Sequence, residues 1–259
     1  MMKSTKTLST LSAIGFERYE LADLLEVSET DQRFQGLLVE FSDLPPDPYS
    51  ASSLRYRRYG RGILTPWSRN FTWIPPVLNE WGEWISEYYQ GDNNPEYSGA
   101  IREFSSITKA TMDNPLLTEI IMFNFDQTWW PDHDSSSPLH VGVHLIKLSV
   151  ERDDQVAISS PNELHQDGEP YTFAHLIYRD NAVGGRNTIA PPRCAGMLPE
   201  ELSPQLLLAD FELTKPLESY GVSDTKVSHY VSPIRKGAAP EPGRRAVLLI
   251  DFTPMKPRI

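Results

Sequence analysis

The chain has 259 residues, of which 39% are hydrophobic and 23% are charged, so it is long and apolar enough to fold as a globular protein with a full core. Its formal net charge of −11 opposes binding to phosphate backbones, and we expect no nucleic-acid partner. The single cysteine, Cys194, excludes a disulfide framework and a multi-thiolate zinc site within one chain. We find neither a signal-peptide core nor an apolar run long enough to span a bilayer, and therefore expect a cytoplasmic protein with no membrane partner.

Helical patterns dominate the chain to about residue 130. Residues 17–27 predict a short amphipathic helix. Residues 76–90 predict a second helix, because apolar side chains recur there at helical spacing. The segment begins with Pro76, and the first turn of a helix tolerates proline. Asn114, followed by Pro115, predicts the start of a third helix with an apolar stripe made of Leu116, Leu117, Ile120 and Ile121.

After residue 138 the chain consists of short runs rich in β-branched and aromatic residues, with turn residues between them. The runs are LHVGVHLIKLSV, QVAISS, YTFAHLIYR, NTIA, LLLADFEL, KVSHYVS and RAVLLIDF. Strands that follow one another in this way predict a sandwich or barrel rather than βαβ units. We expect one mainly β domain over residues 1–259, with a helical part over about 1–130 flanking an antiparallel double-sheet core over about 138–255.

Three side chains in the β-rich half have the types and spacing of a metal site. His165 and Asp167 are two residues apart in ELHQDGEP, so an extended backbone points both to the same side. His229 lies between valines on a later predicted strand, where it is either a core histidine or a ligand that projects into the barrel. Two histidines and one carboxylate form the facial triad of mononuclear non-haem iron(II). A His-x-Asp sequence alone is weak evidence, because roughly one chain in four of this length contains it by chance.

Two arginines, Arg244 and Arg245, begin the last apolar run. A charge beside a buried strand is costly unless it is paired, and a guanidinium group pairs well with a carboxylate. The distal carboxylate of 2-oxoglutarate is such a partner. A solvated strand end is the alternative, and the alternation of the strand alone does not decide between them.

Several motifs together resemble one known family. They are H-x-D-x-x-P at 165–170, TFAHLIYRDNAVGGRNTIA, KVSHYVSPI and R-x-V-L-L-I-D-F. They are similar to the bacterial 2-oxoglutarate/iron dioxygenases that hydroxylate free amino acids, the L-isoleucine dioxygenase group, and the similarity extends from about residue 50. The resemblance implies a double-stranded β-helix, which is the cupin-like jelly roll.

The resemblance also implies the site and its cofactors. It makes His165, Asp167 and His229 the ligands of Fe(II), and Arg245 the residue that binds the cosubstrate 2-oxoglutarate. Arg244 remains a rival, because one extra residue lies between His229 and the last strand. The implied reaction uses dioxygen to hydroxylate an unactivated C–H bond of a small molecule, a free amino acid or an amino-acid derivative. A carboxylate at position 167 argues against halogenation.

Candidates for substrate binding lie upstream of the triad. Arg58 and Tyr56, within the run RYRRY, could hold a substrate carboxylate, and Arg102 in IREFSSI is a similar candidate, although charged runs are more often solvated faces. For His144, the sequence favours a supporting role over direct substrate contact. His175 follows Asp167 closely and is expected in the core. The alternative function is a cupin-like metal-binding isomerase or a non-oxidative binding module, which would have no need of Arg245. A homodimer is left open.

Overall fold

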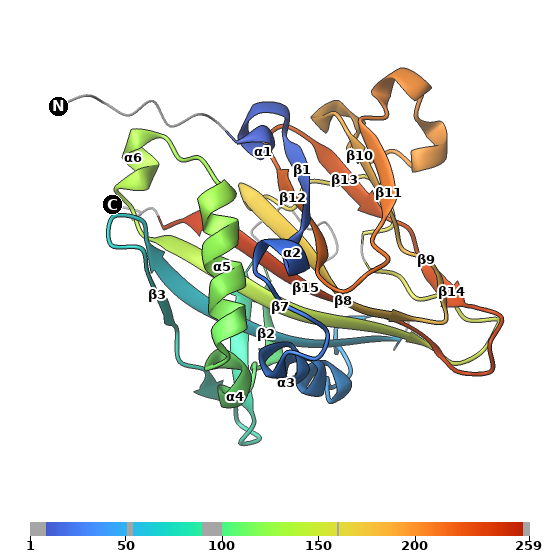
Figure 1. Cartoon of the computed structure of the whole chain (residues 1–259), viewed down its shortest axis with the longest axis horizontal. Coiled ribbons are helices and arrows are strands. Elements are labelled where there is room, and N and C mark those ends of the chain that lie inside the picture. The colour runs from blue at the N-terminus through green and yellow to red at the C-terminus, as the bar shows by residue number, and fades with distance from the viewer. Residues whose placement is uncertain (1–8, 51–53, 90–99, 160, 256–259) are drawn as a thin grey trace.

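The fold is built around one large antiparallel sheet (Figure 1). A computed structural model describes residues 9–50, 54–89, 100–159 and 161–255. The seven strands of the sheet are, in spatial order, β1 (Phe16–Glu20), β12 (Glu218–Ser223), β8 (Tyr171–Asp180), β15 (Gly243–Pro254), β7 (Leu139–Val150), β2 (Arg55–Thr65) and β3 (Asn70–Trp73). The predicted apolar runs β7, β8 and β15 are neighbours at its centre. Such runs suit strands that are covered on both faces.

Helices cover one face of this sheet. They are α1 (Thr10–Ile14), α2 (Leu21–Leu24), α3 (Gln32–Ser42), α4 (Lys109–Met112), α5 (Pro115–Gln127) and α6 (Asp132–Ser135). Figure 1 shows α3 and α5 lying across the large sheet. The predicted start of α5 is confirmed, since Asn114 Oδ1 accepts a hydrogen bond of 2.9 Å from the N–H of Leu116. The four residues of its apolar stripe are fully buried in the main core.

Smaller sheets cover the opposite face. One contains β11 (Ala209–Glu212), β10 (Arg186–Ala190) and β13 (Ser228–Val231), another contains β9 (Ala182–Gly184) and β14 (Ile234–Lys236), and a third contains β4 (Val77–Leu78), β5 (Trp84–Tyr89) and β6 (Ile101–Ser105). A second apolar cluster joins the β10 sheet to the large sheet, with Ile189 and Phe211 packed together with Tyr220 and Val222. Two facing layers of antiparallel strands form the predicted jelly roll. Short 3₁₀ turns, Pro192–Cys194, Pro199–Glu201 and Pro204–Leu206, connect β10 to β11.

Two helix predictions are wrong. Residues 17–27 contain β1 and the single turn α2, because β1 pairs along its whole length with β12, a partner about 200 residues away in the chain. Residues 76–90 contain β4 and β5, joined by a turn in which Asn79 Oδ1 accepts hydrogen bonds from two backbone N–H groups and Gly82 has a φ of +77°. Trp81, which belonged to the expected helical stripe, is 72% exposed.

The part expected to be helical therefore contributes strands β1 to β6, and β2 belongs to the large sheet itself. The described residues of the segment QVAISS, 155–159, supply only an isolated bridge between Ala157 and Ile234. Within the described ranges, every helix is too short or too polar to cross a membrane.

Candidate active site

A cavity of about 140 Å³ lies between the large sheet and the smaller sheets. Alternate residues of the large sheet line it, because successive side chains of a strand point to opposite faces. On β15 these are Arg245, Val247, Leu249 and Asp251, whereas Ala246, Leu248 and Ile250 pack into the core beneath the helices. This strand, which contains the last apolar run of the sequence, thus has a charged residue at each end of its cavity face.

His165, Asp167 and His229 meet in this cavity. His165 and His229 form an isolated antiparallel bridge in which each backbone N–H donates to the carbonyl of the other at 2.9 Å. The Asp167 carboxylate lies 3.6 Å from His165 Nε2 and 3.3 Å from His229 Nε2. One nitrogen or oxygen from each residue falls within 4.8 Å of the others, which is the spacing of a metal site.

The protonation of His165 and Asp167 fits a divalent cation. His165 Nδ1 lies 2.9 Å from the carbonyl of Glu163, to which it can donate, and Nε2 is then left with a free lone pair. Burial, and then the nearby charge of His229, lower the pKa of His165 to about 4. Burial opposes ionisation of Asp167, but His229 and His165 hold the pKa of this carboxyl well below its usual range. Two imidazole nitrogens and one carboxylate are the donor set that iron(II) takes in facial triads.

Asp224 fixes the loop that carries Asp167. Its two carboxylate oxygens accept hydrogen bonds from the N–H groups of Asp167 (2.8 Å) and Gly168 (2.9 Å), and its carbonyl accepts one from the side chain of Gln166. Burial, and then the charge of Asp167, raise the pKa of Asp224 to about 6. We did not predict this residue from the sequence, because it lies in a turn far along the chain and carries no motif.

Arg245 reaches the cavity and Arg244 does not. Arg245 is 2% exposed, whereas Arg244 is exposed on the other side of β15. The structure gives Arg245 no hydrogen bond or salt bridge within the described residues, and its Nε is buried without a partner. Burial lowers its pKa to about 10. Gly185, with a φ of +71°, leaves room for this side chain, since a Cβ there would lie 2.8 Å from Arg245 Cδ.

Because side chains alternate along β2, the substrate-binding candidates on this strand are divided between its two faces. Tyr56 and Arg58 face away from the cavity, where Arg58 Nε lies 3.1 Å from a Glu40 carboxylate oxygen. The structure therefore does not bring these two residues to the site. Arg55 and Arg57, on the opposite face of β2, line the cavity together with Arg102 and His144.

His175 lies in the core, as expected. It is fully buried, and its ring nitrogens lie 2.9 Å from Asn124 Nδ2 and 2.8 Å from Ser219 Oγ. It therefore makes no part of the cavity, whereas His229 does.

Comparison with known proteins identifies the family. The family model described as 2OG-Fe dioxygenase matches residues 39–251. The chain belongs to this family. It is 31% identical over 243 residues to L-isoleucine-4-hydroxylase of Bacillus thuringiensis, covering 92% of this chain and 90% of that protein. It is 25% identical over 163 residues to 3(1)-hydroxy-L-isoleucine 4-dioxygenase of Pantoea ananatis (strain AJ13355), covering 61% of this chain and 60% of that protein.

Solved structures share the fold. The dioxygenase superposes on the crystal structure of IDO from Bacillus thuringiensis with a TM-score of 0.71 at 23% identity, covering 95% of this chain and 92% of that one. The TM-score is 0.73 at 18% identity for a bsmA homologue from Methylobium petroleophilum PM1, covering 94% of this chain and 90% of that one. The predicted jelly roll is confirmed.

The protein is thus an enzyme, an iron(II)-dependent dioxygenase that uses 2-oxoglutarate and dioxygen and acts on a small molecule. The alternative of a cupin-like isomerase or a non-oxidative binding module finds no support in these comparisons.

Proposed function

We propose that this dioxygenase hydroxylates an unactivated C–H bond in the aliphatic side chain of a free amino acid or a close derivative. Two relatives are named for reactions of L-isoleucine and of a hydroxylated L-isoleucine. The cavity supports the proposal with apolar side chains that line it beside its charged groups, namely Ile146, Val222, Val231, Val247 and Leu249. Apolar walls of this kind suit a branched aliphatic side chain.

We infer that His165, Asp167 and His229 hold the iron and that Arg245 binds the distal carboxylate of 2-oxoglutarate. One observation carries this assignment: a buried arginine without a counter-ion lines the same cavity as a facial set of two histidines and a carboxylate. A buried cation of this kind is costly until an anion pairs with it.

Each group then has a role in the reaction. The bound iron and 2-oxoglutarate supply the oxidising power that breaks the C–H bond. Asp167 occupies one ligand position with a carboxylate, which favours transfer of a hydroxyl group over transfer of a halide. Arg245 fixes the orientation of the cosubstrate, and the surrounding sheets exclude bulk water from the reacting carbon.

The test uses the complete protein without oxygen. Iron(II) and 2-oxoglutarate are added, and the weak visible charge-transfer band of the chelate is recorded. We expect the band in the wild type and in His140→Gln, a control on β7 outside the cavity, and we expect its loss in His229→Ala. A wild type without the band, or a His229→Ala protein that retains it, would refute the proposed centre. Free amino acids are then screened for substrate-dependent succinate release, and a complete lack of release would refute the substrate class while leaving the centre in place.

A further inference from the structure

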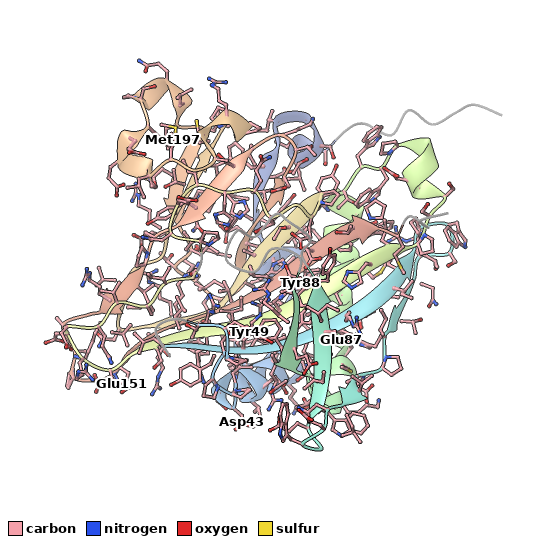
Figure 2. The ribbon with its side chains drawn as sticks, turned by 180° about the vertical axis from the view of Figure 1, so that it is seen from behind. Asp43, Tyr49, Glu87, Tyr88, Glu151 and Met197 are labelled. Carbon is pink, nitrogen blue, oxygen red and sulfur yellow. The ribbon has the colours of Figure 1, made fainter. Side chains whose placement is uncertain are left out.

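The cavity contains a second arginine without a salt bridge, Arg57, at the end where β5 crosses the large sheet. Figure 2 shows this crossing from behind, with Tyr88 of β5 drawn over the middle of the sheet. Arg57 is buried, its guanidinium carbon lies 5.4 Å from the centre of the Tyr88 ring and 4.1 Å from that of Phe104, and its Nε has no hydrogen-bond partner among the described residues. The nearby Arg55 is already engaged, with Nε 2.6 Å from an Asp47 carboxylate oxygen. Arg57 is therefore the cation that an incoming anion can use.

Two further side chains hold Arg57 in place. Its Nη2 donates to His144 Nδ1, and His144 Nε2 lies 2.9 Å from Asp251 Oδ2, to which it can donate. Burial, and then the charge of Arg57, lower the pKa of His144 to about 4, so the ring is neutral near pH 7 and accepts at Nδ1. Because this contact occupies one terminal nitrogen, the Nε edge of the guanidinium remains available to a ligand. His144 is thus a positioning residue for Arg57.

A buried carboxyl group without a cation contacts the hydroxyl of Tyr88. Glu169 lines the same cavity, and the Tyr88 hydroxyl donates to its Oε1 at 3.0 Å. The structure gives Glu169 no salt bridge within the described ranges. Arg57 and Glu169 both contact Tyr88, and all three residues line the same cavity. A cation and a carboxyl group without salt bridges, on one cavity wall and sharing the contact residue Tyr88, form a site for a ligand that carries both charges.

We propose that Arg57 binds the α-carboxylate of the substrate, and that Glu169 binds its α-ammonium group. The proposal rests on the proposed function and specifies it: the site selects a free α-amino acid zwitterion. It rejects N-acylated amino acids, which leave Glu169 without a cation, and amines without a carboxylate, which leave Arg57 without an anion. The Arg102 guanidinium, 4.7 Å from the Tyr88 ring, adds positive charge beside the carboxylate position.

The first test needs no variant. Binding to the anaerobic protein loaded with iron(II) and 2-oxoglutarate is measured by calorimetry, which requires no turnover. The ligands are L-isoleucine, L-leucine and L-valine, together with the deaminated acid, the decarboxylated amine and the N-acetyl derivative of L-isoleucine. A charge-assisted contact is worth about 1.5–3 kcal/mol, so each analogue should bind about tenfold to one hundredfold more weakly than L-isoleucine. Equal affinity for the N-acetyl derivative, or no binding of L-isoleucine, L-leucine or L-valine, would overturn the proposal. A persistent charge-transfer band would show that the iron centre is nevertheless formed.

Two variants then assign the charges. Glu169→Gln should weaken the binding of L-isoleucine by about tenfold or more and leave the affinity for the deaminated acid unchanged. Arg57→Gln should weaken the binding of L-isoleucine to a similar extent and leave the affinity for the decarboxylated amine unchanged. Glu103→Gln and Arg69→Gln, at exposed positions outside the cavity, are the matched controls. If a variant weakens the binding of every ligand by the same factor, the replaced residue has only a structural role, and that result would overturn its assignment.

Discussion

Replacing Arg245 by methionine should stabilise the free protein and impair its use of 2-oxoglutarate. Burial lowers the pKa of Arg245 to about 10, yet the group remains charged at neutral pH. Each pKa unit corresponds to about 1.4 kcal/mol, so holding this charge without a partner costs the free protein about 3 kcal/mol at every pH below about 10. In Arg245→Met that cost disappears, and no hydrogen bond or salt bridge within the described residues is lost with it.

We therefore expect the free energy of unfolding of the metal-free protein to rise by about 1–3 kcal/mol in urea, since the smaller side chain fills the space less well. The affinity for 2-oxoglutarate should fall about one hundredfold or more, because a charge-assisted contact in a buried site is lost. Arg244→Met, on the exposed side of the same strand, is the control and should change neither value appreciably. An Arg245→Met protein that is less stable than the wild type and binds 2-oxoglutarate equally well would refute the reasoning.

Two further predictions concern the ligand loop and the core. Asp224→Asn should weaken iron(II) binding about tenfold or more in a metal titration, because an amide oxygen cannot replace both carboxylate oxygens at the N–H groups of Asp167 and Gly168; an unchanged affinity would contradict this. His175 stays neutral when folded, because burial lowers its pKa to about 3. As pH falls below the unfolded value of about 6.5, only the unfolded chain gains this proton, so the free energy of unfolding should drop by about 2 kcal/mol at pH 5. His175→Gln should remove that part of the slope in metal-free protein, and parallel slopes would exclude His175 as its source.

The sequence predicts strands well where they lie at the centre of the sheet and consist mainly of strand-forming residues. β7, β8 and β15 are rich in β-branched and aromatic residues, and α5 carries its own start signal in Asn114 and Pro115. It fails where partners distant in the chain override the local pattern. β1 is a strand because it completes the edge beside β12, and no periodicity within 17–27 contains that information.

The candidate site shows the same limit for side chains. Two-residue alternation predicts that His165 and Asp167 share a face. Glu169 also lines the cavity, but it follows a bend at Gly168, whose φ is +87°, and we did not identify it from the sequence. In RYRRY every second residue faces the cavity, but the sequence does not reveal which set does so. The prediction took Tyr56 and Arg58, whereas the pairing of Arg57 with Ile146 and of Tyr59 with His144 sets the opposite phase.

The two unpaired arginines explain how one cavity can bind two ligands that carry carboxylates, each at its own arginine. Arg245 and Asp251 lie on the same face of β15, six residues and so about 20 Å apart. Arg179 adds positive charge near Arg245, whereas Asp251 adds negative charge at the end where Arg57 lies; burial, and then the charge of Asp251, raise the pKa of the Glu169 carboxyl there. The dianion 2-oxoglutarate is therefore repelled from the Arg57 end, while a zwitterion brings to that end the cation that Glu169 lacks. The discrimination comes from the neighbours of each arginine, Arg179 beside Arg245 and the carboxyl groups beside Arg57, because the arginines alone would accept either ligand.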